Sequence, residues 1–89
     1  MSAHEETLEV VELVQQISPL LVGKSANVQG AALADLLAIW LAGHVIRGDP
    51  KMTKKMREMM LKAHIVAVRG LIPLNYKTYV EPQLKEQTQ

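Results

Sequence analysis

The sequence predicts an all-α protein: a small three-helix bundle with a short extra turn and an extended C-terminal arm. Apolar residues recur at helical spacing in three separate segments, and each segment opens with a residue type that caps helices. The chain has 89 residues, of which 48% are hydrophobic and none is cysteine, so we expect one domain without disulfides or thiolate metal sites. We place this single helical domain at residues 1–81 and a flexible polar tail at 82–89.

The first helix is predicted over residues 3–17. Ser2 and Glu5 have the spacing of a capping box, in which each side chain satisfies a free backbone N–H at the start of a helix. Apolar residues then alternate with glutamates in the pattern of an amphipathic helix. Pro19 lacks a backbone N–H and restricts the residue before it, so we expect the helix to stop there. A short extra turn should follow and close at Gly23.

The second helix is predicted over residues 26–46, with Ser25 or Asn27 as its N-cap. Between Ala31 and Ala42 it is apolar on nearly every side, so it must be covered on more than one side. Small residues recur at every fourth position, which favours close packing against a neighbouring helix. They are Ala26, Gly30, Ala34, Ala38 and Ala42.

The third helix is predicted over residues 50–69. Asp49 suits the N-cap, Pro50 suits the first helical position, and Gly70 suits the C-terminal cap. Apolar residues alternate in steps of four and three, a spacing typical of a seam for a partner helix. They are Met52, Met56, Met59, Ala63 and Val66.

The segment after Pro73 has a different pattern. Residues 74–80 contain several β-forming side chains, but the chain offers no second strand to pair with them. We therefore expect residues 71–80 to form an extended arm that lies over the helices. The polar residues from Pro82 onward should fray.

A homodimer is predicted because the apolar circumference of the second helix exceeds what two neighbours in a thin domain can cover. The two-fold interface is expected at this helix or at its junction with the third helix. The residues that we assign to the interface are Ala34, Ala38, Trp40, Leu41, Met52, Met56 and Met59.

Charge is divided unevenly along the chain, although the net charge is only +1. Residues 1–46 hold five acidic side chains and one basic side chain, a net charge of −4. Residues 47–69 hold seven basic and two acidic side chains, a net charge of +5. The candidate face for an anion or a partner consists of Arg47, Lys51, Lys54, Lys55, Arg57 and Lys62.

Three interpretations of this basic face are open. Its lysines can pair with the glutamates of the first helix, within one chain or between subunits, which is the interpretation we favour. The face can instead bind the phosphates of nucleic acid or of an anionic lipid. It can also bind an acidic protein partner.

Several functional classes are disfavoured by composition and motifs. Aromatic residues make up only 3% of the chain, which disfavours RNA binding by stacked side chains. No nucleophile elbow, phosphate-binding loop or histidine spacing typical of a metal site is found, so we expect no enzyme, cofactor or metal. The most apolar stretch, residues 31–46, is shorter than the roughly 20 residues that span a bilayer, so we expect no membrane span and a cytoplasmic protein.

The function predicted from these features is a small non-catalytic helical module for protein–protein interaction or regulation, acting as a homodimer. The alternative is a nucleic-acid-binding protein, similar to a transcriptional regulator, that uses the basic helix at residues 47–62. An acidic protein is a further candidate partner, and nucleic acid is the less favoured one.

Overall fold

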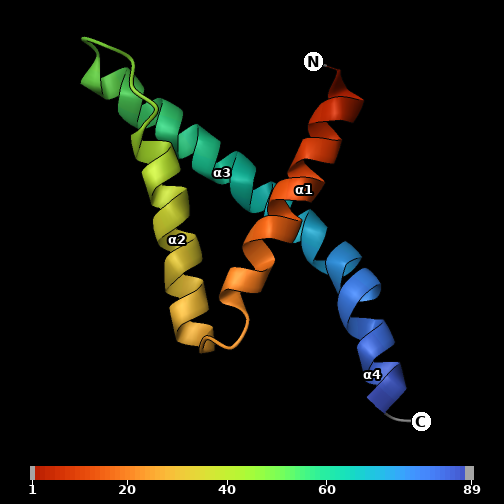
Figure 1. The fold of residues 1–89 in the computed structure, drawn as a ribbon. Helices are drawn as coiled ribbons and strands as arrows, with labels where there is room; N and C mark the ends of the chain where they lie inside the picture. The colour runs from red at the N-terminus through yellow and green to blue at the C-terminus, as the bar shows by residue number, and fades with distance from the viewer. Residues whose placement is uncertain (1, 88–89) are drawn as a thin grey trace. The chain divides into compact units, whose positions relative to one another are not determined.

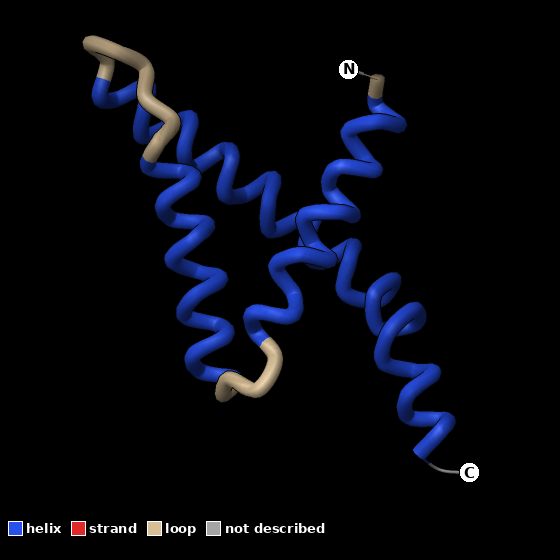
Figure 2. Tube along the Cα trace, viewed as in Figure 1, coloured by secondary structure: helices blue, strands red, loops and turns tan. Residues whose placement is uncertain are grey.

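The computed structural model describes residues 2–87, which are helical along most of their length and include no strand (Figures 1 and 2). The predicted all-α class is therefore confirmed. Three main helices, α1 (Ala3–Leu21), α2 (Ala26–Ala42) and α3 (Pro50–Asn75), are followed by a π-helical segment, η1 (Tyr76–Val80), and by α4 (Glu81–Gln87). Contacts divide the chain into a first unit that ends at Leu37 and a second unit that begins at Ala38.

The first unit begins with the predicted cap. Ser2 is the N-cap of α1, and its hydroxyl accepts a 3.2 Å hydrogen bond from the backbone N–H of Glu5. The predicted stop before Pro19 is wrong, because α1 continues through this residue to Leu21. A proline so near the end of a helix removes a single backbone bond, and the backbone N–H of Val22 bonds to the carbonyl of Pro19 at 3.3 Å.

The turn from α1 to α2 is held by local hydrogen bonds. Gly23 has a φ of +82°, a backbone conformation that favours glycine. The hydroxyl of Ser25 accepts from the backbone N–H of Val28 at 3.2 Å, so Ser25 is the one of the two predicted caps that caps α2. Gln29 donates from Nε2 to the carbonyl of Leu21 at 2.7 Å and so ties the start of α2 to the end of α1.

In the second unit, α2 ends at Ala42, four residues before the predicted end at Ile46. The last turn tightens because the N–H of His44 bonds to the carbonyl of Leu41 at 3.1 Å. A loop then leads to α3, whose predicted start is confirmed. Asp49 is the N-cap and accepts from the N–H of Met52 at 3.0 Å, and Pro50 occupies the first turn.

The predicted end of α3 at Arg69 and the predicted extended arm are both wrong. The helix passes through Gly70, which has no positive φ, and through Pro73 to Asn75. It then continues as η1, where the N–H of Glu81 bonds to the carbonyl of Tyr76. A helix satisfies its backbone groups locally, whereas an extended arm would need a partner strand, and the described residues include no strand.

The C-terminal residues also differ from the predicted polar tail. Residues 81–87 form α4, in which Lys85 lies 3.9 Å from the carboxylate of Glu81. This is an exposed i, i+4 pair of the kind that adds a few tenths of a kcal/mol to a helix. The last two residues of the predicted tail, 88 and 89, lie outside the described part of the chain.

Burial is sparse throughout the described residues. None of their hydrophobic side chains is buried, and Thr53, with 6% of its surface exposed, is the buried residue among them. Along residues 2–87, no helix is long and apolar enough to span a membrane. The helices therefore carry apolar faces that the described structure leaves open.

Candidate interaction surfaces

The loop between α2 and α3 is fastened by Thr53, which projects from the first turn of α3. Its hydroxyl oxygen accepts from the backbone N–H of Ile46 at 2.9 Å. The same oxygen lies 3.1 Å from the carbonyl of Ile46 and 2.9 Å from that of Asp49, so its single proton is donated to one of the two at a time. One side chain thus ties Ile46, in the middle of the loop, to Asp49 at its end, and the buried hydroxyl is hydrogen-bonded.

Arg57, one helical turn further along α3, binds the end of α2. Its Nε donates to the carbonyls of Leu41, at 3.2 Å, and His44, at 3.1 Å, and its Nη2 donates to that of Ala42 at 2.8 Å. These carbonyls lie at the negative end of the α2 dipole, where a cation is stabilising. Of the six residues predicted to form the basic face, Arg57 is thus the one whose charged group contacts the fold itself.

Trp40 lies at the same end of α2 and contacts two histidines. Its ring is 5.0 Å from that of His44 at 73°, an edge-to-face arrangement, and 5.7 Å from that of His64 on α3. His44 is held in place by a 2.7 Å hydrogen bond between Nδ1 and the carbonyl of Trp40. Because 47% of its surface remains exposed, Trp40 is open to a partner as well as to these neighbours.

The residues predicted to form the dimer interface differ in their exposure. Leu41 and Met56 are half-buried, whereas the other five are exposed, and Met59 is the most open of the three interface methionines at 71%. Ala34 belongs to the first unit and the other six to the second. Trp40 and Leu41 are consecutive residues near the end of α2.

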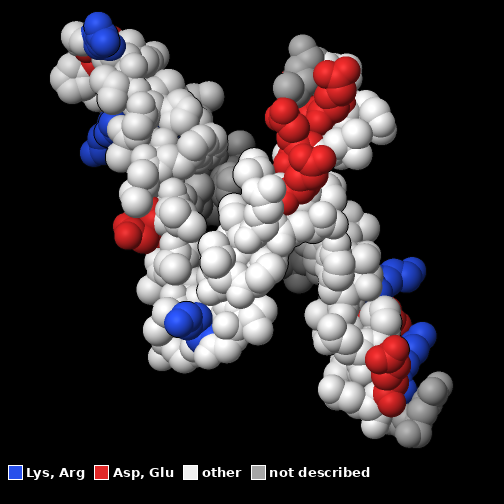
Figure 3. All heavy atoms as spheres, in the orientation of Figure 1, with Lys and Arg blue, Asp and Glu red and all other residues white. Residues whose placement is uncertain are grey.

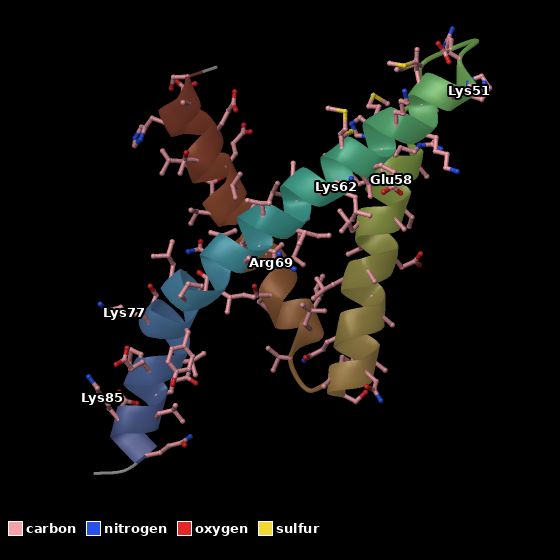
Figure 4. All side chains as sticks on the ribbon, turned by 180° about the vertical axis from the view of Figure 1, so that it is seen from behind. Lys51, Glu58, Lys62, Arg69, Lys77 and Lys85 are labelled. Carbon is pink, nitrogen blue, oxygen red and sulfur yellow. The ribbon has the colours of Figure 1, made fainter. Side chains whose placement is uncertain are left out.

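The four lysines of the predicted basic face form an open surface on α3. Lysines line a shallow hollow of about 490 Å³ together with Glu58 and Met59. Figure 4 labels Lys51, Glu58 and Lys62 along this helix. No described residue of the second unit forms an ion pair with these lysines, and Arg47 is exposed in the loop outside the hollow. The lysines are Lys51, Lys54, Lys55 and Lys62.

The acidic counterpart of this face lies in the first unit. Glutamates gather along α1, where all of them are exposed (Figure 3). Glu5, Glu9 and Glu12 recur at i, i+4 and i+7 and so share one face of the helix. Their pairing with the lysines of α3 stays a prediction.

An apolar surface near the C-terminus was missed by the sequence reasoning. Residues from the end of α3 and from η1 line an open hollow of about 520 Å³. The signal was present as a spacing of three and four residues, but the β-forming side chains and Pro73 favoured an extended arm. The lining residues are Val68, Leu71, Ile72, Asn75, Tyr76, Tyr79 and Val80.

No group of acidic or histidine side chains among residues 2–87 is arranged to hold a metal ion. Comparisons with known proteins give no match: no protein-family model, no curated protein and no solved structure resembles the chain. The functional interpretation therefore rests on the surfaces described above.

Proposed function

We propose that the protein is a small non-catalytic interaction or regulatory module that acts as a homodimer. The observation that carries this proposal is the exposure of apolar faces on helices whose described residues bury no hydrophobic side chain. An amphipathic helix in water gains most of its stability from packing its apolar face, not from its own propensity. Fully burying one large aliphatic side chain contributes about 1.5–3 kcal/mol, so a partner that covers several of them is strongly favoured.

A second copy of the same chain can cover these apolar faces without any other molecule being needed. Most soluble oligomers are homo-oligomers with closed symmetry, and two-fold dimers are the commonest. The net charge of +1 imposes little long-range repulsion between copies. The half-open surface around Trp40 and Leu41 supports the predicted junction as one contact region.

The test is absolute mass by light scattering on a size-exclusion column, together with helicity by circular dichroism over a hundredfold range of concentration. We expect twice the chain mass of 9.9 kDa, and helicity that falls as dilution dissociates the dimer. A well-folded protein of 9.9 kDa whose helicity does not change with concentration would contradict the proposal.

A nucleic-acid-binding function is the second candidate, and the lysine-lined hollow on α3 supports it. Lysine side chains that form no ion pair within their unit are suited to contact phosphates, and such contacts weaken steeply as salt rises. We expect a chain with Lys51, Lys54, Lys55 and Lys62 all changed to Gln to lose duplex binding. A chain with Lys24→Gln and Lys77→Gln, which lie outside the hollow, is the control.

The readout is fluorescence anisotropy of a labelled duplex at low and at high salt. Binding that is abolished by salt and by the four substitutions in the hollow would support this candidate. Absence of binding at low salt would remove it. Equal loss in the control chain would indicate attraction by net charge alone, without a defined site.

A further inference from the structure

The C-terminal part of the second unit carries an apolar seam that no element of that unit covers. The seam consists of Ile65, Val68, Ile72, Asn75 and Tyr79, whose spacing of three, four, three and four residues is that of a coiled-coil seam. Four of the five line the same hollow, and Ile72 and Tyr79 expose 61% and 65% of their surfaces. A single helix with such a face is marginally stable alone.

Asn75, the fourth of the five seam residues, is the one with an amide side chain. Its side chain forms no hydrogen bond with any residue in the described part of the chain. An amide offers both donors and an acceptor, so two copies of one asparagine can bond to each other across a two-fold axis. A single polar residue in an apolar seam is a known device that fixes the register of two helices.

Charges on one edge of the helix are placed symmetrically about Asn75. Arg69 lies seven residues, or about two helical turns, before Tyr76 and therefore on the same edge. The π turn bonds the N–H of Glu81 to the carbonyl of Tyr76, which continues this edge to Glu81. Arg69 precedes Asn75 by six residues and Glu81 follows it by six.

We propose that two copies of the chain dock through this seam as an antiparallel pair of helices, with the two-fold axis at Asn75. In this arrangement residues 71–79 of the two copies overlap, and the same edges of the two helices face each other. Arg69 of one copy therefore lies level with Glu81 of the partner subunit, and the symmetry produces this pair twice. A parallel pair would instead set Arg69 against Arg69, which is repulsive.

Charge complementarity selects a second copy as the occupant of the seam. Along the seam helix the basic residues Arg69 and Lys77 precede Glu81 and Glu86, with Lys85 between the two glutamates (Figure 4 labels Arg69, Lys77 and Lys85). The exposed pair between Glu81 and Lys85, at 3.9 Å, is weak. It therefore does not prevent the carboxylate of Glu81 from pairing with Arg69 of the partner subunit. This inference rests on the proposed homodimer and names the surface that forms it.

The test uses charge reversal in the full chain, with dimer dissociation measured by sedimentation equilibrium. Arg69→Glu places glutamates opposite each other in both pairs, and Glu81→Arg does the same with arginines. We expect each variant alone to dimerise at least about tenfold more weakly than the natural chain, because like charges then meet twice. Lys85→Gln controls for loss of the pair within α4, and Lys62→Glu controls for a charge change elsewhere on α3.

Mixing the two variants gives the sharpest result. A heterodimer of Arg69→Glu with Glu81→Arg contains two attractive pairs, so we expect the equimolar mixture to dimerise about as tightly as the natural chain. A single chain that carries both reversals should likewise recover its homodimer. Weakening of both variants without recovery in the mixture would overturn the antiparallel register.

The two levels of the proposal fail in different ways. If the natural chain is a dimer and both variants keep its affinity, the seam is not the interface and the proposed homodimer stands. If the natural chain is monomeric at every concentration, the proposed function itself fails, and the seam proposal fails with it. Circular dichroism of each variant at high concentration verifies that the helix is retained.

Discussion

The two ends of α3 differ in how they are held. The N-terminal end is joined to the end of α2 by hydrogen bonds from Thr53 and Arg57 to loop and helix carbonyls. The C-terminal end, with η1 and α4, makes its contacts with the adjacent segments of the same continuous helix. Polar side chains therefore hold the first region together within one chain, whereas the second exposes apolar side chains that no element of the second unit covers.

This comparison predicts two kinds of sensitivity. Variants of the α2–α3 junction should lower stability equally at every protein concentration, since the bonds they remove lie within the chain. Variants of the seam should act through association and so depend on concentration. Three substitutions test the contrast, from the largest expected effect to the smallest.

Arg57→Met should destabilise the protein by about 2–3 kcal/mol, because it removes charge-assisted bonds to three carbonyls while keeping an apolar stem. Urea unfolding followed by circular dichroism at two protein concentrations measures the loss and shows that it does not depend on association. Lys55→Met, at an exposed lysine two positions earlier, is the matched control and should cost less than about 0.5 kcal/mol. Equal losses in the two variants would remove the special role of Arg57.

Thr53→Val should destabilise by about 1–2 kcal/mol, since it keeps the shape of the buried side chain and leaves the N–H of Ile46 without its acceptor. The same unfolding measurement applies. Thr7→Val is the control, because the hydroxyl of Thr7 donates to the carbonyl of Ala3 at 2.9 Å at an exposed position. A loss at residue 7 as large as that at residue 53 would show that burial does not decide the effect.

Gly70→Ala should stabilise the seam helix by about 0.5–1 kcal/mol, because Gly70 is helical and an added methyl group would meet no atom within 4 Å apart from the adjacent backbone of its own helix. Gly48→Ala should have the opposite sign, because Gly48 has a φ of +79°. Thermal unfolding measures both effects: the melting temperature should rise in Gly70→Ala and fall in Gly48→Ala, relative to the natural chain. Destabilisation by Gly70→Ala would favour the helix end that the sequence predicted at this residue.

Helix starts were predictable because their signals are local. Ser2, Ser25 and Asp49 each cap a helix through a backbone N–H three residues away, and a pattern of neighbouring residues suffices to identify them. Helix ends were less predictable. Gly70 and Pro73 are typical of a helix end, but each raises the free energy of a helix by only a limited amount. The hydrogen bonds of a continuous helix can outweigh that cost.

The candidate surfaces were predictable in part. The cluster of lysines after Pro50 was evident from the chain, and Lys51, Lys54, Lys55 and Lys62 line one hollow. The role of Arg57 was not, because its acceptors lie 13 to 16 residues earlier and no periodicity links them. The C-terminal seam was missed because residues that favour a strand also suit the apolar face of a helix. Only the backbone conformation distinguishes an extended arm from such a helix.

The aromatic residues are divided between the two ends of α3. Trp40, the one tryptophan of the chain, lies at the α2–α3 junction, whereas both tyrosines, Tyr76 and Tyr79, line the hollow at the C-terminal seam, and the chain has no phenylalanine. Tryptophan emission, excited at wavelengths that tyrosine does not absorb, therefore reports on the junction without any label. Its change in denaturant should not depend on protein concentration, whereas tyrosine emission should change on dilution if the proposed seam pairs two copies.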